Sequence, residues 1–287
     1  VVSLGKKFDF TLGFARGAVL AADAGIIVVD PEPDCINKAE ELASGRIRLR
    51  GTATIACAIE EIAGQASGAN PEHEAWRAEV SEALALRQPG PVGGARVNPQ
   101  EICESVDRML TAANDPILIC DGGEFGQWAQ AGCSARVRII NGISGAIGGG
   151  LCYALAAKLA RPDATVIALM GDGTAGFHFT EFDTAAREGA NFIAIIGNDD
   201  CWNAEHQIQL RDYGPDRLIG CQLSPDARYD LAAAAFGGHG EYVSDRAGLD
   251  EALQRAAASD CPACINVAMA GVAAPTVTRA GTAPGGQ

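Results

Sequence analysis

The sequence lacks three features that would each point to a large class of proteins. Its 22 Lys and Arg residues against 36 Asp and Glu residues give a net charge of −14, and no basic cluster forms a face for nucleic acid. No apolar run approaches the roughly 20 residues that a membrane-spanning helix needs. No signal peptide is recognisable, so we expect a cytoplasmic protein that acts on a small molecule, with neither nucleic acid nor membrane as partner.

Ten cysteines are present, but their positions do not fit a disulfide framework. Cys57, Cys120 and Cys152 lie in apolar runs, where a free cysteine packs like a small hydrophobic residue. The C-x-x-C pair, Cys261 and Cys264, leads into an expected strand, and residues three apart on a strand point to opposite faces. A metal or disulfide shared by this pair is therefore not expected.

The pattern along the chain predicts four parts. Residues 1–65 contain strand-like segments such as "AGIIVVD" with helical patterns between them, which predicts part of a Rossmann-like α/β domain. Residues 66–97 have the Gly, Pro and Ala content of a linker, with a middle stretch that suits a helix. Residues 98–271 alternate Ile/Val/Ala strands with helices, and residues 272–287 have the composition of a flexible tail. The expected fold class is α/β, with a doubly wound parallel sheet in residues 98–271.

The segment "MGDGTAG" at 170–176 places Asp172 inside a glycine turn that follows an expected strand. The turn fits the dinucleotide pattern G-x-G-x-x-G. Yet a carboxylate 4 Å from a phosphate charge, with no cation between them, is repelled by about 4 kcal/mol at an effective dielectric of 20. A Mg²⁺ ion held by the carboxylate reverses the sign of that interaction.

A second acidic turn, "NDD" at 198–200, follows the next expected strand. Because parallel strands end at the same edge of a sheet, we expect Asp172 and this turn to face one crevice. A diphosphate held through Mg²⁺ explains both turns, whereas a nicotinamide dinucleotide explains only the first. The other alternative is that Asp172 merely caps the helix that follows it.

The spacing of these two turns resembles the cofactor motif of the thiamine diphosphate enzymes. Three further segments extend the resemblance to the group of acetolactate synthase, benzaldehyde lyase and 2-hydroxyacyl-CoA lyase: "DGGEFGQWAQ" at 121–130, "GISGAIGGGLCYALAAKLA" at 142–160 and "YDLAAAAFGGHGEYV" at 229–243. Residues 98–271 resemble the diphosphate- and Mg²⁺-binding domain of such an enzyme. The resemblance implies thiamine diphosphate and Mg²⁺ as cofactors. It also implies a lyase, decarboxylase or carboligase that acts on 2-oxo acids or 2-hydroxyacyl-CoA.

The resemblance also implies roles for single residues. The metal would be bound by the side chains of Asp172 and Asp199, which stands where the family more often has Asn, and by the backbone carbonyl of Cys201. Ile147 would be the apolar wedge that keeps the cofactor bent, and Gly145 would accept a hydrogen bond from the amino group of its pyrimidine. The other residues expected at the cofactor are Gly123, Glu124, Phe125, Gly171, Gly173, Thr174 and Asn203.

Residues just beyond the second acidic turn are candidates for contact with the substrate. Trp202 suits either a wall of the substrate cavity or an ordinary core position. Glu205 and His206 follow closely and are candidate polar contacts.

One part of the family's active site has no counterpart in this sequence. The glutamate that activates the cofactor comes from an N-terminal pyrimidine-binding domain, and residues 1–65 resemble only the second half of the family's middle domain. We therefore expect a C-terminal part of a longer polypeptide, or one subunit of a split enzyme, that is active only with that domain. Assembly as a homo- or hetero-oligomer, a dimer or a tetramer, is expected. A transferase of the acetolactate synthase type and a non-catalytic cofactor-binding module are the alternatives.

Overall fold

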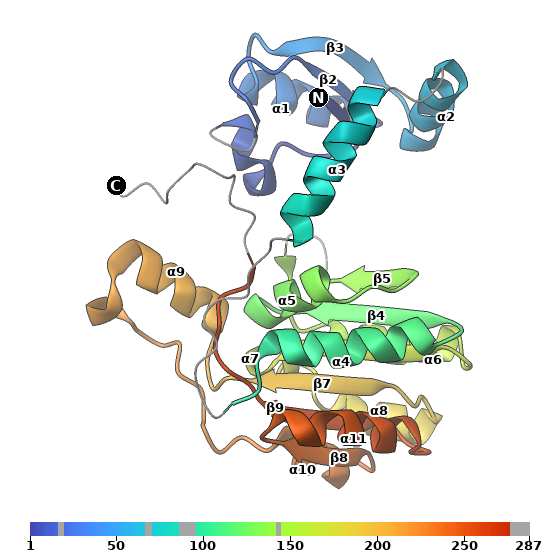
Figure 1. The fold of residues 1–287 in the computed structure, drawn as a ribbon, viewed down its shortest axis with the longest axis vertical. Helices are drawn as coiled ribbons and strands as arrows, with labels where there is room; N and C mark the ends of the chain where they lie inside the picture. The colour runs from blue at the N-terminus through green and yellow to red at the C-terminus, as the bar shows by residue number, and fades with distance from the viewer. Residues whose placement is uncertain (17–19, 67–70, 86–95, 142–144, 276–287) are drawn as a thin grey trace. The chain divides into compact units, whose positions relative to one another are not determined.

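The structure is a computed structural model that describes residues 1–16, 20–66, 71–85, 96–141 and 145–275. The chain divides into two compact units, Val1–Val80 and Ser81–Gln287, and each has its own parallel sheet (Figure 1). Within the described ranges, no helix is both long enough and apolar enough to cross a membrane. Residues 276–287, most of the expected tail, lie outside the described part of the chain.

The first unit is built on three parallel strands in the order β1-β2-β3. Alternate residues of β2, Ile26 and Val28, face a small core that they share with Ile36 and Ala39 of α1. The elements are β1 (Val2–Leu4), the 3₁₀ helix η1 (Phe10–Ala15), β2 (Ile26–Asp30), α1 (Pro33–Leu42), β3 (Ile47–Thr52) and α2 (Ile55–Gln65). The predicted α/β arrangement is confirmed for this unit.

A helix, α3 (Pro71–Ala85), lies inside the range 66–97 that the sequence predicted to be a linker with a helical middle. Residues 67–70 and 86–95 of that range are outside the described residues. Val97 is buried and pairs with Met269, so the chain joins the sheet of the second unit before α4 (Pro99–Ala112) begins. At the start of α4, Asn98 caps the helix by accepting the Gln100 N–H at 2.8 Å.

The second unit has six parallel strands in the order β5-β4-β6-β7-β9-β8. They are β4 (Pro116–Asp121), β5 (Val137–Ile140), β6 (Thr165–Gly171), β7 (Ile193–Asn198), β8 (His239–Val243) and β9 (Ala263–Ala268). The chain runs from β4 to β5 in one direction across the sheet and from β6 to β7 in the other. The strand order therefore reverses between neighbours β4 and β6, and in open α/β sheets the ligand crevice lies beyond the carboxyl ends of the strands at such a point.

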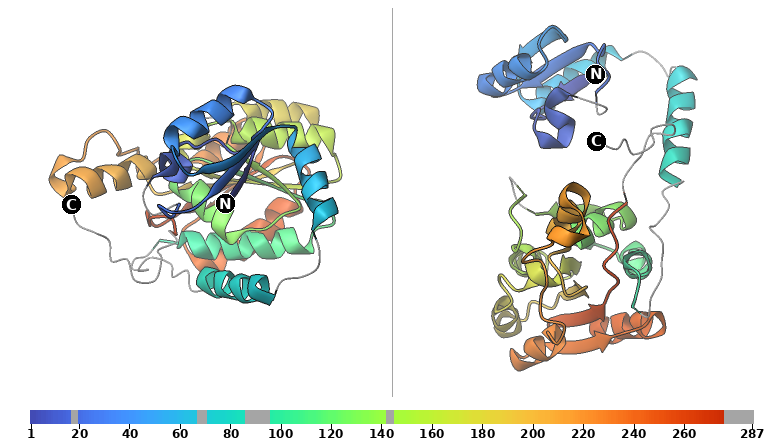
Figure 2. Two further views of the ribbon diagram at one scale, coloured as in Figure 1. Left: turned by 90° about the horizontal axis from the view of Figure 1, so that it is seen from above. Right: turned by 90° about the vertical axis from the view of Figure 1, so that its left-hand side faces the viewer.

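Helices cover both faces of this sheet, because alternate strand residues are apolar toward each side (Figures 1 and 2). On one face, Leu118 and Ile195 pack in a core with residues of α4, α5 and α11. On the other face, Ile119 and Ile196 pack in a core with residues of α6, α8 and α10. The helices are α5 (Glu124–Gly132), α6 (Gly150–Ala160), α7 (Asp172–Ala175), α8 (Glu181–Glu188), α9 (Asn203–Tyr213), η3 (Pro215–Arg217), α10 (Tyr229–Ala235) and α11 (Arg246–Ala257). The predicted doubly wound parallel sheet is confirmed.

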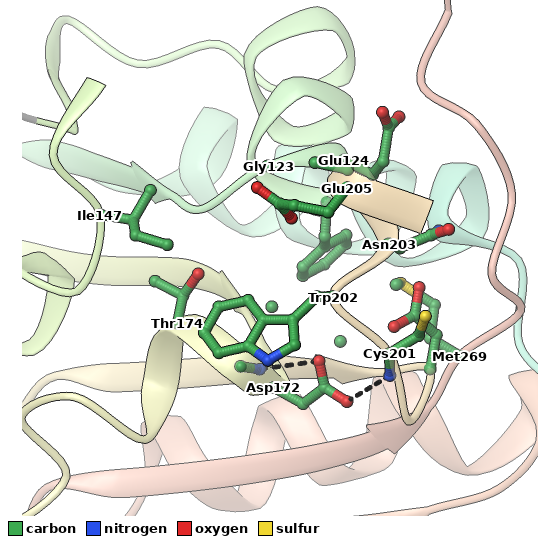
Figure 3. Close-up of a pocket in the computed structure, with 16 residues that line it drawn as sticks. Gly123, Glu124, Ile147, Asp172, Thr174, Cys201, Trp202, Asn203, Glu205 and Met269 are labelled. Atoms are coloured by element: carbon green, nitrogen blue, oxygen red, sulfur yellow. Dashed lines mark hydrogen bonds between the residues drawn. The ribbon is translucent and has the colours of Figure 1, made fainter. Parts of the chain in front are cut away.

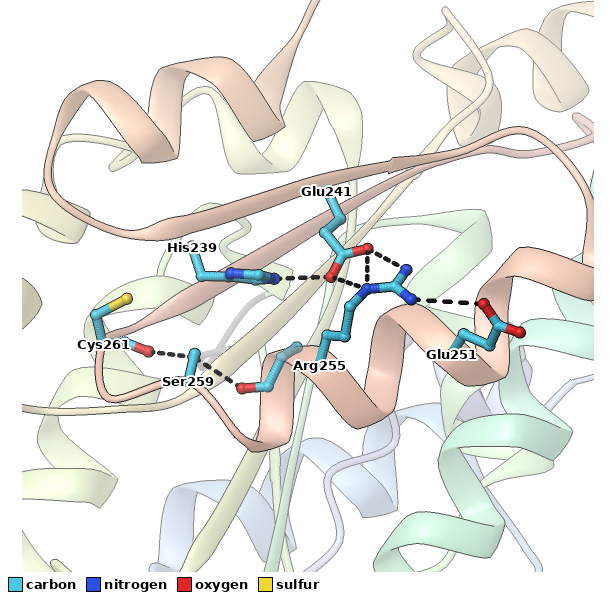
Figure 4. Close-up of polar contacts among 7 residues, drawn as sticks. His239, Glu241, Glu251, Arg255, Ser259 and Cys261 are labelled. Carbon is cyan, nitrogen blue, oxygen red and sulfur yellow. Dashed lines mark hydrogen bonds and ion pairs between the residues drawn. The ribbon is translucent and has the colours of Figure 1, made fainter.

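A charged network ties the edge strand β8 to α11 (Figure 4). Glu241 of β8 accepts hydrogen bonds from Arg255 Nη2 at 2.6 Å and from His239 Nε2 at 2.7 Å. Burial raises the pKa of Glu241, but the bonds from Arg255 and His239 outweigh it and hold that pKa below the ordinary value. In the loop between α11 and β9, the hydroxyl of Ser259 donates a hydrogen bond to the carbonyl of Cys261 at 2.9 Å.

Candidate functional site

Three neighbouring strands, β4, β6 and β7, end at one edge of the sheet in turns made of glycine and acidic residues. After Asp121 at the end of β4, the chain reaches Gly123, the N-cap of α5. After Gly171 at the end of β6, Asp172 begins α7. β7 ends at Asn198, the first residue of the second acidic turn. The two acidic turns predicted to share a crevice therefore lie on adjacent strands.

Asp172 connects the turn after β6 with the turn after β7. Its Oδ1 accepts the backbone N–H of Gly173 at 2.8 Å, and its Oδ2 accepts the N–H of Cys201 at 3.3 Å (Figure 3). Tyr229 donates its hydroxyl to the backbone carbonyl of Asp172 at 2.9 Å. Burial raises the pKa of Asp172 to about 6, although the two N–H groups lower it. The carboxylate is thus held in place by the backbone of two turns.

Asp199 is a second acid beside Asp172, and it is half-buried. Burial and the charge of Asp172 raise the pKa of Asp199 to about 7. Two neighbouring carboxylates disfavour each other's ionisation, and a divalent cation between them removes that repulsion. Nearby, the Nδ2 atom of Asn203 is buried and has no hydrogen-bond partner among the described residues. The site therefore has unused capacity to bind both a cation and an oxygen ligand.

Asp200, the third residue of the acidic turn, makes its contacts elsewhere. It forms an ion pair with Arg96, and its backbone carbonyl accepts the Leu223 N–H at 2.7 Å and Gln222 Nε2 at 2.8 Å. Its φ of +59° is in the left-handed region, which aspartate tolerates better than most residues. These contacts fix the turn from outside, and the ion pair with Arg96 neutralises one of the turn's two acids.

The predicted metal site has two side-chain ligands and one backbone carbonyl. Among the residues that the structure describes, no group of three or more His, Cys, Asp and Glu side chains has the geometry of a metal site. Asp172, Asp199 and Cys201 all line the same cavity, as the prediction required. Magnesium binding remains a prediction, because two carboxylates complete a Mg²⁺ site only with oxygens from water or a phosphate.

The turns enclose a cavity of about 70 Å³ (Figure 3). The residues that line it are Gly123, Glu124, Phe125, Ile147, Gly171, Asp172, Gly173, Thr174, Gly197, Asp199, Cys201, Trp202, Asn203, Ala204, Glu205 and Met269. All predicted site residues are among them except Gly145 and His206. Gly145 is exposed with a φ of +73°, and His206 is half-buried on α9.

Two glycines allow the start of α9 to pack closely on the turns. A Cβ atom on Gly123 would lie 2.4 Å from the Cβ of Ala204, and one on Gly173 would lie 2.7 Å from the ring of Trp202. No side chain caps the first turn of α5, whose backbone N–H groups are donors of the kind that bind phosphate oxygens. The glycines are therefore required by the close packing of Trp202 and Ala204 against the turns.

Some lining residues were not predicted from the sequence. Gly197 precedes the acidic turn, and a Cβ there would lie 2.6 Å from the ring of Phe125. Met269 follows β9 and lies among the lining residues. Their positions at the carboxyl ends of β7 and β9 are the signal that could have indicated them, since every strand end of a parallel sheet faces the same edge.

Residues 121–267 match the family described as "Thiamine pyrophosphate enzyme, C-terminal TPP binding domain". The chain belongs to the thiamine pyrophosphate enzyme family. Thiamine pyrophosphate is thiamine diphosphate, so the predicted resemblance is confirmed.

Several named members of the thiamine pyrophosphate enzyme family are similar to this chain. A "Probable acetolactate synthase" of Mycobacterium bovis is 33% identical over 272 residues, which cover 92% of this chain and 47% of the relative. "2-hydroxyacyl-CoA lyase 2" of Xenopus laevis is 35% identical over 170 residues, which cover 58% of this chain and 25% of the relative. The chain thus spans about half, or less, of the length of these relatives.

Comparison with a solved structure confirms the fold. The thiamine diphosphate-dependent 4-hydroxybenzoylformate decarboxylase of Rhodococcus jostii RHA1 matches with a TM-score of 0.67 at 22% identity. The match covers 89% of this chain and 46% of that protein. The predicted roles of single residues in the site remain predictions.

Proposed function

We propose that this chain supplies the diphosphate- and Mg²⁺-binding part of an enzyme that cleaves or forms C–C bonds with thiamine diphosphate. The observation that carries the proposal is the meeting of both glycine turns with Asp172 and Asp199 at one cavity, joined by the bond from the Cys201 N–H to Asp172. The residues fit the cofactor on two further counts. The Nδ2 atom of Asn203 is buried and has no hydrogen-bond partner among the described residues, and no side chain caps the first turn of α5, whose N–H groups can bind phosphate oxygens.

The chain's residues would hold the charged end of the cofactor. In this proposal Mg²⁺ is bound by the carboxylates of Asp172 and Asp199 and by the carbonyl of Cys201, all of which are hard oxygen donors. Thr174 and the first-turn N–H groups of α5 face the diphosphate. When bound, thiamine diphosphate supplies a carbon nucleophile and an electron sink. The contribution of these residues is anchorage, charge compensation and exclusion of water.

The size of the cavity supports a site that is completed from outside this part of the molecule. Its volume of about 70 Å³ is far below the roughly 300–1,000 Å³ of ordinary small-molecule sites. We infer that only the metal and diphosphate end is enclosed here. A pyrimidine-binding domain or subunit would supply the other wall and the activating glutamate, in a homo- or hetero-oligomeric assembly.

The names of the relatives support two substrate classes. We propose a lyase, decarboxylase or carboligase acting on 2-oxo acids or 2-hydroxyacyl-CoA, with Trp202 and Glu205 at the cavity as contacts for the substrate. Acetolactate synthase-type transfer is the second candidate, and it is favoured by the relative that covers 92% of this chain. A cofactor-binding module without catalysis is the third.

The test is deuterium exchange at the thiazolium C2 atom, followed by NMR, for this chain with and without a pyrimidine-binding domain. The proposal predicts fast exchange only when the domain is present. The complete assembly is then assayed with 2-oxo acids, 2-hydroxyacyl-CoA and pyruvate as the acetolactate precursor. Fast exchange by the chain alone would show that the activating acid lies within these residues. Tight cofactor binding without turnover of any substrate would favour the non-catalytic module.

A further inference from the structure

The turn that carries Ile147 is held through both backbone polar groups of Gly148. The N–H of Gly148 lies 3.2 and 3.1 Å from the two carboxylate oxygens of Asp121. The carbonyl oxygen of Gly148 lies 2.7 Å from Nδ1 of His178. Because a carbonyl oxygen only accepts, the His178 ring must donate from Nδ1 in this contact.

Asp121 is a buried acid that accepts hydrogen bonds from the backbone of this turn. It is 0% exposed at the end of β4, and it also accepts the N–H of Gly150 at 2.5 Å. A buried carboxylate is costly unless it is hydrogen-bonded, so these N–H groups compensate its burial. A Cβ on Gly150 would lie 2.9 Å from Asp121 Oδ2, which leaves room only for glycine. Asp121 and the turn are therefore fitted to each other.

The backbone of Gly148 has little freedom to move. Its φ of +100° is a conformation that residues with a side chain rarely adopt. A Cβ there would lie 2.7 Å from the Cβ of Phe177, the residue before His178. The segment 177–178 thus contacts Gly148 both through packing and through a hydrogen bond, even though His178 itself is exposed.

Ile147 is the residue that this turn presents to the cavity. It lies at the wall of the cavity on the side of Thr174, away from Cys201 (Figure 3). Neither Asp121 nor His178 is among the lining residues. A role for these two residues at the site must therefore act through the backbone of the turn.

We propose that Asp121 and His178 are positioning residues that set the place of Ile147 against the bound cofactor. This inference rests on the proposed function, because only a cofactor at the cavity gives Ile147 a partner to contact. Loss of either bond releases one polar group of Gly148 and lets the turn relax. Since a displacement of about 1 Å can cost about 100-fold in rate, turnover should fall by about 10- to 100-fold with little change in cofactor affinity.

The first test measures amide hydrogen exchange in the free 287-residue chain. Asp121→Asn and His178→Phe should speed exchange across residues 145–150 by about tenfold, the effect of one lost hydrogen bond. His178→Asn keeps a donor where Nδ1 stands and should restore slow exchange. His239→Phe removes a ring donor at β8, away from the turn, and is the control. Unchanged exchange in both Asp121→Asn and His178→Phe would overturn the inference. If Asp121→Asn does not fold, the comparison of His178→Phe with His178→Asn tests the inference on its own.

The second test compares cofactor binding with turnover. By calorimetry with Mg²⁺, His178→Phe should change the affinity for thiamine diphosphate by less than about threefold, since the diphosphate end is untouched. In the complete enzyme, kcat should fall by at least about tenfold and recover in His178→Asn. An equal loss of affinity and kcat would overturn the positioning role. If the wild-type chain binds no cofactor, the proposed function fails as well, whereas normal binding with unchanged exchange contradicts this inference alone.

Discussion

The Asp172 carboxylate accepts the backbone N–H of Cys201 at 3.3 Å and so joins the turns at the ends of β6 and β7. This bond brings the carboxylate within reach of Asp199, whose pKa is raised by burial and then by the charge of Asp172. Without a cation, the two acids repel each other in a buried site. With Mg²⁺ between them, the same arrangement becomes favourable, and it presents a positive centre to a diphosphate.

Asp199→Asn should stabilise the cofactor-free chain and weaken metal-dependent binding only mildly. The change removes one of two neighbouring like charges but keeps an oxygen that can bind Mg²⁺. We expect a higher melting temperature and a loss of less than about tenfold in thiamine diphosphate affinity, measured by calorimetry with Mg²⁺. Asp216→Asn, at an exposed residue of η3, is the control and should change neither quantity. A lower melting temperature for Asp199→Asn would contradict the repulsion between the two acids.

Gly123→Ala should displace the start of α9 and weaken cofactor binding. The new Cβ would meet the Cβ of Ala204 at 2.4 Å, which is closer than any real contact. Overpacking of this kind typically costs about 1–3 kcal/mol, so we expect affinity to fall by at least about tenfold. Adding Ala204→Gly removes the clash and should restore most of the binding. If the double variant binds as weakly as Gly123→Ala, the methyl group blocks the ligand itself and not α9.

Much of this site could be predicted from the sequence, because its acids follow apolar runs. Two such runs in a parallel sheet must end at one edge, and that rule placed Asp172 and Asp199 together. Asp121 ends its strand in the same way. Its role depends on contacts with residues 148–150, and no local sequence pattern indicates those contacts. His178 is exposed, and its contact with Gly148 is likewise a tertiary contact that no local pattern indicates. The packing of Trp202 on a glycine turn is a tertiary contact without any periodic signal.

Ile147→Ala should lower turnover more than cofactor affinity. The side chain lines the cavity but is none of the proposed ligands of the metal or the diphosphate, so its loss should leave that anchor intact. In the complete enzyme we expect kcat to fall by at least about tenfold while affinity changes by less than about threefold. Ile208→Ala, on the exposed part of α9, is the matched control. Equal losses of kcat and affinity would show that Ile147 only packs the core.

Glu241→Gln should reduce the stability of the second unit at neutral pH but not at low pH. The folded-state pKa of Glu241 lies below its ordinary value of 4.5, so its stabilisation is present above that pH and is lost as the pH falls through the folded pKa. In urea unfolding at pH 7, we expect the free energy of unfolding to fall by about 1 kcal/mol in Glu241→Gln. At low pH, where the Glu241 side chain of the wild type is also uncharged, we expect no difference between the two proteins. Glu251→Gln, at the more exposed partner of Arg255, should have a smaller effect. Equal losses at both pH values would contradict the charged network.

The central claim is that Asp172 and Asp199 bind a diphosphate through Mg²⁺, and calorimetric titration of the wild-type chain with thiamine diphosphate tests it most directly. We predict binding that requires Mg²⁺, is abolished by EDTA, and weakens by at least about 100-fold in Asp172→Ala, which loses one of the two carboxylate ligands. Asp216→Ala, at the exposed acid of η3, should bind as the wild type does. Thiamine diphosphate binding that persists at full strength in EDTA, or in Asp172→Ala, would contradict the account.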